Sequence, residues 1–476
     1  MKIKGIIMVI AGLCFFVSGS LSAQEKRPIT PQDCVTVRNI LPIDETASWA
    51  WAVKISPDGG SVAYLVQSPN LQTNINDVDL YVRAVPQDPS APSRHLLSGK
   101  ITDFVWSSGG RSLVVLANEN GRRVLEIIDV VTAEKQLLIR ANTDIEEFTI
   151  DKSGDTIVYT TKRESTSGGD HDPTAQDIAR GYRIPFGQES ESGWPHGSVF
   201  LTNRIHGVWT TPRLLEFTSP LSGQRMTSLA YSANEPIQPA LSPDGSKLLV
   251  VYEDSSTTMP DEWSSSGMKK FLNTTAGTIQ AFHLVLMYNI TAGETSVPLK
   301  SPFVSGRPLW APDSQSFLIA GAPEVGSAEE KEEVKDGSLG HSSGALLFSV
   351  GSEVKKVSII SRRLAYVGEV ALHIGKDGSV LARVERESAG TITRFTYQNG
   401  EWKQTESFKV PLPLTIASIA VNEHYVIGSF SDLTTPPELF EYQRDNKKVE
   451  IFEKLNPQFD RRRAVLLSAS FARARS

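Results

Sequence analysis

One short pattern recurs along the whole chain and limits what it can fold into. Each copy has an apolar residue, a turn built from Ser, Pro, Asp or Gly, and then a run of alternating apolar residues. The clearest copies are "ISPDGGSVAYLV" from Ile55 and "LSPDGSKLLVVY" from Leu241. Weaker copies begin at Val105, Ile150, Trp310, Ile374 and Ala420. Internal repetition of this kind is typical of architectures built from one repeated unit.

The residues of the pattern predict a turn followed by a half-buried strand. In Ser56-Pro57-Asp58-Gly59, proline presets the backbone at the turn entry and aspartate bonds to nearby backbone groups, while glycine tolerates the turn exit. The following residues alternate in polarity, with Val62, Tyr64 and Val66 on one side. One side of this strand is therefore expected to face a core.

Further strands are expected inside the same unit. Arg122 to Ile139 predicts two strands joined by a turn at Thr132-Ala133-Glu134, and Thr391 to Phe408 predicts a hairpin that turns at Asn399-Gly400. Four strands that recur at roughly 45 to 50 residues are typical of a β-propeller blade. The sequence therefore predicts an all-β fold: a seven- or eight-bladed β-propeller with four-stranded antiparallel blades. Other all-β architectures stay open.

The spacing of the turns also sets the expected domain limits. The propeller is expected to cover residues 51–460, after a lead-in segment at 24–50 and before a basic tail at 461–476 that is expected to be disordered. The interval from Lys152 to Ser242 is about twice the repeat period, so it holds either an extra blade or an insertion.

Two polar stretches are predicted to be insertions in the propeller. The first, at 163–197, has a short helix expected around 174–181; the second, at 324–343, is acidic and rich in turn residues. Long loops on a rigid scaffold often carry function, and as often are only solvated.

The first 23 residues differ from the rest of the chain. Positive charge at Lys2 and Lys4, an apolar run from Gly5 to Val17 and a small-residue exit ending at Ala23 predict a secretory signal peptide cut after Ala23. An uncleaved membrane anchor is the alternative. Cleavage leaves Cys34 as the single cysteine, so no internal disulfide is expected. We expect an exported protein, periplasmic or extracellular.

Charge and hydropathy exclude two classes of partner. The formal net charge is −6, whereas a nucleic-acid partner would require a basic face. After residue 23 no stretch is long and apolar enough to span a bilayer, so no membrane association is expected after signal cleavage.

The stretch Gly340-His341-Ser342-Ser343-Gly344 matches the G-x-S-x-G pattern of a hydrolase nucleophile elbow. Such an elbow needs a strand before the serine and a helix after it. Here an acidic loop precedes Ser342, and "ALLFSVGSEVKKVSII" after it predicts a strand, a turn at Gly351-Ser352 and another strand. We therefore interpret the match as accidental and do not predict a catalytic Ser342.

Other candidate sites have ordinary explanations. Asp170-His171-Asp172 lacks a second ligand cluster with zinc- or calcium-like spacing, so a solvated loop is expected. Glu146-Glu147 would suit a substrate amino group, but a polar strand entry explains it. Arg461-Arg462-Arg463, with Arg473 and Arg475, fits a frayed basic tail or a contact with an anionic surface. The sequence thus assigns no catalytic, metal or cofactor-binding residue, and no cofactor.

The signal peptide, the "SPDG" units and the opening "ITPQDCVTVRNILPIDETASWAWAVKISPDGGSVAYLV" together resemble bacterial prolyl oligopeptidase-family serine peptidases, which include dipeptidyl-aminopeptidase and acylaminoacyl-peptidase-like enzymes. The resemblance covers roughly residues 28 to 460. It implies a propeller that caps a following α/β-hydrolase domain and limits which peptides reach its serine.

The chain departs from this family after "EIFEKLNPQFD", which resembles the passage into the hydrolase domain. Such a domain would need about 200 or more further residues, and only "RRRAVLLSASFARARS" follows. No catalytic triad carries over from the resemblance. We expect a frameshift or premature stop near Asp460.

Three functions remain open. The first is an exported propeller that resembles the substrate-gating domain of such a peptidase, not catalytic alone, with peptides or a separately encoded hydrolase as partners. The second is a stand-alone periplasmic propeller that binds a protein or peptide. The third is a hydrolase or lyase that uses the propeller channel, against which stands the lack of a converging acid, base or metal cluster.

Overall fold

The computed structural model describes most of the predicted propeller. The described residues are 27–28, 30–40, 52–85, 92–162, 196–219, 223–230, 237–254, 282–298, 304–321, 344–349, 357–361, 371–383, 391–399, 401–412, 414–431, 435–459 and 462–463. The predicted signal peptide lies outside them. No helix among them is long and apolar enough to cross a membrane.

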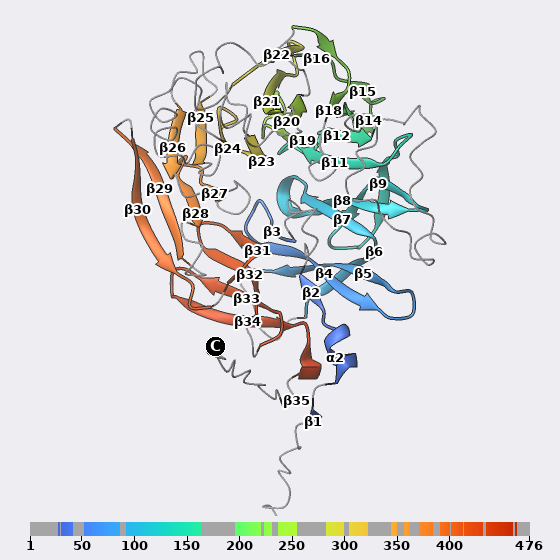
Figure 1. Cartoon of the computed structure of the whole chain (residues 1–476), viewed down its shortest axis with the longest axis vertical. Coiled ribbons are helices and arrows are strands. Elements are labelled where there is room, and N and C mark those ends of the chain that lie inside the picture. The colour runs from blue at the N-terminus through green and yellow to red at the C-terminus, as the bar shows by residue number, and fades with distance from the viewer. Residues whose placement is uncertain are drawn as a thin grey trace, which may run out of the picture.

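Successive antiparallel sheets follow one another around a ring, with the strand that precedes each repeat turn nearest the centre (Figure 1). The first sheet holds β2 (Asn39–Ile40), β3 (Val53–Ile55), β4 (Ser61–Asn70), β5 (Ile75–Ala84) and β6 (Arg94–Gly99). The second holds β7 (Ile101–Trp106), β8 (Ser112–Glu119), β9 (Arg122–Asp129) and β10 (Lys135–Ile139).

The last three sheets have the same four-stranded order. They are β23 (Val304–Trp310), β24 (Ser316–Gly321), β25 (Gly344–Ser349) and β26 (Val357–Ser361); β27 (Ala371–Ile374), β28 (Val380–Arg383), β29 (Thr391–Gln398) and β30 (Glu401–Lys409); and β31 (Leu414–Val421), β32 (Tyr425–Phe430), β33 (Glu438–Gln443) and β34 (Lys448–Lys454). The prediction of four-stranded antiparallel blades is confirmed.

Between these sheets lies one sheet of ten strands. It holds β11 (Ile145–Ile150), β12 (Thr156–Lys162), β13 (His196–Ile205), β14 (Val208–Trp209), β15 (Arg213–Leu214), β18 (Leu229–Ala230), β19 (Gln238–Leu241), β20 (Lys247–Asp254), β21 (Phe282–Asn289) and β22 (Glu294–Ser296). A separate pair, β16 (Phe217–Thr218) and β17 (Arg225–Met226), lies beside it.

Counted as sheets, the structure has six blades, fewer than the seven or eight that the repeat predicts. The ten-stranded sheet accounts for the difference. It contains two four-strand runs, β11–β12–β13–β15 and β19–β20–β21–β22, which the short strand β18 bridges. A shared apolar cluster fills the space between the runs, with Val158 and Leu201 on one side and Leu248 and Leu286 on the other. Each run begins at one copy of the sequence repeat.

The two clearest copies of the predicted turn share the same hydrogen bonds. In the first sheet the Ser56 hydroxyl donates to Asp58 Oδ1 at 2.5 Å, the Ser61 amide donates to Ser56 Oγ at 2.9 Å, and Gly59 has φ +74°. The second clear copy repeats these contacts with Ser242, Asp244 and Lys247, and Gly245 has φ +73°. Glycine is therefore required for the reason that the sequence indicated: the turn exit lies in the left-handed region.

Two further predicted turns are confirmed. Ala133, between β9 and β10, has φ +61°, and Asn399, between β29 and β30, has φ +54°. Both residues close hairpins at the positions that the sequence indicated.

The repeat turns lie together at one end of the ring, which we call the turn face. The Lys152 amide donates to the Pro243 carbonyl at 2.9 Å, and the Asp244 amide donates to Ser314 Oγ at 3.0 Å, so turns of adjacent repeats touch. Each turn joins a first strand to a second strand. The connections from second to third strands must therefore lie at the opposite end.

We call that opposite end the terminal face, because both described chain ends reach it. The lead-in contains α2 (Pro31–Val35) and then β2, which pairs with the far end of β4. The last strand of the last sheet, β34, runs from the turn face to the terminal face. Beyond it, β35 (Arg462–Arg463) pairs with β1 (Arg27–Pro28), and Figure 1 shows this pair and α2 together outside the ring.

The interval from Lys152 to Ser242 holds no separate four-stranded sheet among its described residues. Instead, 163–195 separates β12 from β13. The predicted helix at 174–181 and the second predicted insertion at 324–343 fall outside the described residues. Both insertions connect second to third strands, so the chain leaves and re-enters the sheets at the terminal face.

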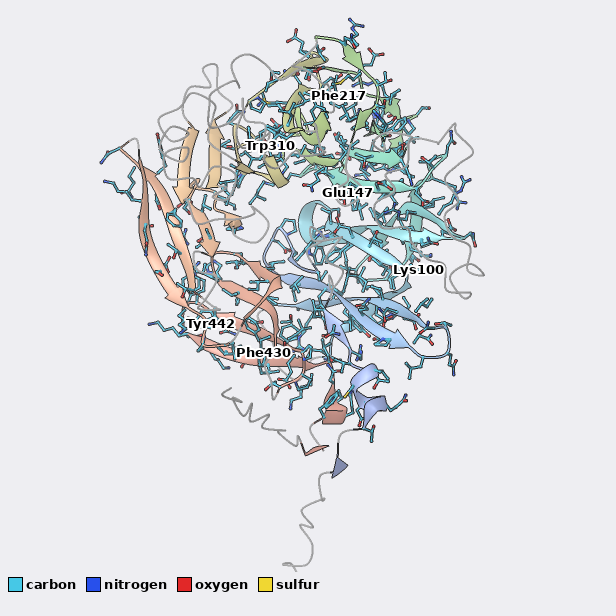
Figure 2. All side chains as sticks on the ribbon, in the orientation of Figure 1. Lys100, Glu147, Phe217, Trp310, Phe430 and Tyr442 are labelled. Carbon is cyan, nitrogen blue, oxygen red and sulfur yellow. The ribbon has the colours of Figure 1, made fainter. Side chains whose placement is uncertain are left out.

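Apolar side chains of neighbouring sheets fill the spaces between the ribbons (Figure 2). The first and last sheets also pack directly on each other, through a cluster that includes Val62, Tyr64, Ile427, Leu439 and Phe452. All four strands of the last sheet come from residues 414–454. No described strand is exchanged between the first and last sheets, so the ring is closed by side-chain packing and by side-chain hydrogen bonds such as that from Arg83 to the Phe452 carbonyl.

Candidate functional site

The structure brings only some of the sequence candidates into view. Ser342 and Asp170-His171-Asp172 lie outside the described residues. Among the described residues, no group of three His, Cys, Asp or Glu side chains is arranged to hold a metal ion. Of the basic tail, only the backbone of Arg462 and Arg463 is described, in β35.

Glu146 and Glu147 lie on the inner strand β11 with different surroundings. The Glu146 carboxylate forms an ion pair of 2.8 Å with Arg123 of the second sheet, so it joins two sheets. The Glu147 amide donates to Thr160 Oγ1 at 3.2 Å on the neighbouring strand. Figure 2 shows Glu147 toward the middle of the ring. At the polar strand entry that the sequence suggested, Glu146 thus forms an ion pair with the neighbouring sheet.

The structure also assembles a Ser–His–Asp cluster that sequence reasoning missed. Asp79 on β5 lies opposite Ser98 on β6, and His95 is three residues before that serine. The Ser98 hydroxyl donates to Asp79 Oδ1 at 2.6 Å, and His95 Nε2 lies 2.9 Å from Ser98 Oγ and 3.3 Å from Asp79 Oδ1. Only the strand register reveals this grouping.

The connectivity of this cluster differs from that of a catalytic triad. In a triad the serine bonds to one imidazole nitrogen and the acid to the other, so that the acid orients the base. Here Nε2 of His95 makes both contacts, and Ser98 bonds directly to the acid. The His95 side chain is 47% exposed. This geometry describes a surface hydrogen-bond network, not an activated nucleophile.

A four-charge network joins the last two sheets at the turn face. Arg394 and Arg444 both bond to the Glu406 carboxylate, at 3.1 and 2.9 Å, and Arg394 also pairs with Glu423. Burial alone would raise the pKa of Glu406, but the hydrogen bonds from the two arginines outweigh it and hold the pKa below its usual value. The charges satisfy one another, so this network stabilises a blade interface.

His373 lies beside that network, with Glu423 Oε1 at 3.9 Å from its Nε2. Burial lowers the pKa of His373, and the nearby Glu423 only partly opposes this effect. The imidazole is therefore neutral near pH 7. No group of three described His, Cys, Asp or Glu side chains around it is arranged to hold a metal ion.

One hollow of about 380 Å³ lies at the outer edge of the second sheet. Its lining residues are Ser112, Ile127, Asp129, Glu134, Lys135 and Gln136. The Asp129 carboxylate accepts the amides of Val131 and Thr132, each at 2.8 Å, and Lys135 pairs with Glu126 at 3.0 Å. Two of its charged side chains, Asp129 and Lys135, are thus engaged in structural contacts.

The terminal face beside the first and last sheets has the most distinctive geometry. Asn456, which is 2% exposed, accepts the Arg38 amide at 2.8 Å and donates to the Arg38 carbonyl at 2.9 Å. The Arg38 guanidinium continues to Ser68 Oγ at 3.1 Å. These hydrogen bonds, which we call the clasp between Arg38 and Asn456, hold the segment before the first sheet beside the segment after the last sheet. The clasp brings two segments from opposite ends of the described chain to one place.

Apolar side chains are exposed close to this face. Leu71 and Ile75, at the tip of the long β4–β5 hairpin, are 51% and 47% exposed, and Val35 of α2 is 51% exposed. Exposed apolar groups of this size are candidates for contact with another protein surface.

No protein-family model and no curated protein sequence matches this chain. Solved structures match its fold. An acylaminoacyl peptidase of Pyrococcus horikoshii superposes with a TM-score of 0.50 at 10% identity, covering 86% of this chain and 53% of that one. The β-propeller domain of the Trilobed protease from Pyrococcus furiosus gives 0.47 at 13% identity, covering 86% and 97%, and TolB from Acinetobacter baumannii gives 0.40 at 11% identity, covering 73% and 65%.

The chain is a β-propeller that is structurally similar to propeller domains of prolyl oligopeptidase-family peptidases, at low sequence identity. It spans about half the length of the acylaminoacyl peptidase. The likeness shows the fold alone.

Proposed function

We propose that this protein is an exported, non-catalytic propeller that gates access to a serine peptidase domain. That domain is either joined to the terminal face or encoded separately. We further propose that the ten-stranded sheet counts as two blades, which gives seven. The clasp between Arg38 and Asn456 carries the proposal, since it brings both ends of the propeller to one place. A domain attached at either end would start beside the same face.

The surroundings of the clasp support a neighbour at this face. The ring is closed there by packing, and the hairpin residues Leu71 and Ile75 are exposed near it. At the turn face, by contrast, the charged groups of the last two sheets pair with one another. The terminal face is therefore the side that we assign to the peptidase domain.

Two described clusters of polar side chains make contacts of a structural kind. In the Ser98–His95–Asp79 cluster, both contacts of the imidazole are made by the same nitrogen, Nε2. Glu146 forms an ion pair with Arg123. Peptide selection by size and shape would then be the contribution of the ring to a reaction performed elsewhere.

A second candidate is a stand-alone propeller that binds a protein or peptide partner in the periplasm. The exposed apolar tip of the β4–β5 hairpin favours it, because such a tip offers contact area without any hydrolase. Under this alternative the same face would contact an unrelated protein.

One experiment separates these functions. The DNA on both sides of the gene is read in all frames for a segment with a strand, G-x-S-x-G and a helix, and the encoded domain is produced with and without this chain. We expect the chain alone to hydrolyse no peptide amide, and the pair to favour short over long peptides in kcat/KM. If the ratio of kcat/KM for short peptides to kcat/KM for long peptides is the same with and without the propeller, gating is excluded. Labelling of this chain by a serine-directed phosphonate would show that it is itself a hydrolase.

A further inference from the structure

The interface between the first and last sheets, which we call the seam, buries charged groups inside its apolar cluster. Along β5, Tyr81 and Val85 face the last sheet, and Arg83 lies between them on the same side. Along β33, Leu439 faces the first sheet and Glu441 follows on the same side, paired in register with Ile427. Arg83 and Glu441 therefore belong to the two surfaces that close the ring.

Glu441 is held in an unusual environment for a carboxylate. The residue is 1% exposed, Gln443 Nε2 donates to its Oε1 at 2.9 Å, and its Oε2 has no hydrogen-bond partner among the described residues. A buried carboxylate oxygen without a donor disfavours the ionised form, because it has lost water and gained no replacement. Burial is the largest contribution and raises the pKa of Glu441.

The neighbouring charges come from each element that packs on this group. From β34, Glu450 raises the pKa further, while Lys448, which is paired with Glu450, lowers it; from β5, Arg83 lowers it. Arg83 itself donates to the Phe452 carbonyl at 3.1 Å and lies 4.9 Å from the centre of that ring. The phenol of Tyr425 lies near Glu441 and that of Tyr64 near Arg83, and the pKa of each is raised, so both stay neutral where Glu441 titrates.

We infer that the seam is a pH-responsive joint, tightest while Glu441 carries a proton and looser once it ionises. A carboxyl whose pKa is higher in the folded state stabilises that state below its unfolded value, and this stability is lost as the pH rises through the folded value. The loss falls on the interface where the ring has no shared strand. A low pH thus favours the closed ring, and a rising pH relaxes it as Glu441 ionises.

Hydrogen exchange of the intact protein tests this inference. Amide exchange of β5, β33 and β34 is compared at about pH 5 and about pH 8, after correction for the intrinsic rate, with β8 and β12 as an internal control. The control strands meet at an apolar cluster that contains Val114, Leu116, Ile157 and Tyr159. We expect a several-fold loss of protection at the seam with rising pH and no comparable loss at the control interface.

Three variants show whether Glu441 is responsible. Glu441→Gln keeps the shape and is expected to abolish the pH response, whereas Glu126→Gln, at a carboxylate 4% exposed and paired with Lys135, should leave it unchanged. Arg83→Gln removes the opposing positive charge, so the midpoint of the response should move to higher pH. A seam response that persists in Glu441→Gln, or one that all blades share, overturns the inference. If Glu441→Gln does not fold, the midpoint shift in Arg83→Gln decides alone.

Discussion

At the scale of single residues, the repeat turns depend on one residue in the left-handed region. Glycine occupies it at positions 59, 154, 245 and 378, but Ser314 has φ +58° at the equivalent place in the fifth repeat. A non-glycine residue there is strained by about 1 kcal/mol. The Ser314 hydroxyl offers a reason for its presence, because it accepts the Asp244 amide at 3.0 Å from the adjacent turn.

Substitution of Ser314 separates these two effects. Ser314→Ala keeps the strain and removes the acceptor, so it is expected to lower stability by about 1 to 2 kcal/mol. Ser314→Gly also loses the acceptor but relieves the strain, so it is expected to stay within about 0.5 kcal/mol of the parent protein. Urea unfolding measures both. Two variants of equal stability would mean that the backbone at Ser314 carries no strain.

The turn carboxylates give the stability a defined acid dependence. The hydroxyl of Ser56 and the amide of Gly60 donate to Asp58 and lower its pKa. A carboxyl with a lowered folded pKa stabilises the protein above its unfolded value, and this contribution is lost as the pH falls through the folded value. Asp58→Asn is therefore expected to lower the Tm at neutral pH, with a difference that vanishes in acid. Asp445→Asn, at a side chain 83% exposed, is the control and should show little change at either pH.

At the scale of elements, adjacent inner strands are locked by tryptophans that end them. Trp106, the last residue of β7, donates its indole N–H to the Lys54 carbonyl at 2.9 Å on β3. Trp310, the last residue of β23 and labelled in Figure 2, donates to the Ala240 carbonyl on β19 at 2.8 Å. In these two repeats the residue before the turn is thus also a donor to the preceding inner strand, which the repeat pattern alone does not show.

Replacing these indoles tests the lock. Trp106→Phe and Trp310→Phe keep a buried ring but leave a strand carbonyl without its donor, so each is expected to cost about 1 to 3 kcal/mol. Trp209→Phe is the control, because Trp209 lies on the short strand β14, where its ring stacks near Arg204 and packs on an apolar cluster. Thermal unfolding compares the three variants. A loss in Trp209→Phe as large as in the others would show that ring size, not the hydrogen bond, matters.

The sequence predicts elements better than the contacts between them. The turns at Gly59, Ala133 and Asn399 are local, since the residues that set each turn are adjacent in the chain. The bridge through β18 that merges two four-strand runs, and the meeting of Asp79, His95 and Ser98, depend on strand register across the fold. The blade count and this cluster therefore could not be read from the repeat.

At the scale of the whole molecule, ring closure depends on residues that are 418 positions apart. Asn456 bonds to both backbone groups of Arg38, and the apolar seam lies beside this clasp. Closure by packing makes the join between the first and last sheets depend on a few buried contacts. Under the proposed function, the same clasp sets the place of attachment of the peptidase domain.

Asn456→Ala is expected to weaken the join between the first and last sheets more than it weakens the other interfaces between sheets. The variant leaves the Arg38 N–H and carbonyl without partners in a buried site, so stability is expected to fall by about 2 to 4 kcal/mol. Protection of β2 and β34 from hydrogen exchange should fall more than that of β8 and β9, because only the former flank the seam. Asn76→Ala, at an exposed position of the first sheet, is the control and should stay within about 0.5 kcal/mol. Equal losses of protection around the ring would show that Asn456 supports the fold generally and does not specifically close the seam.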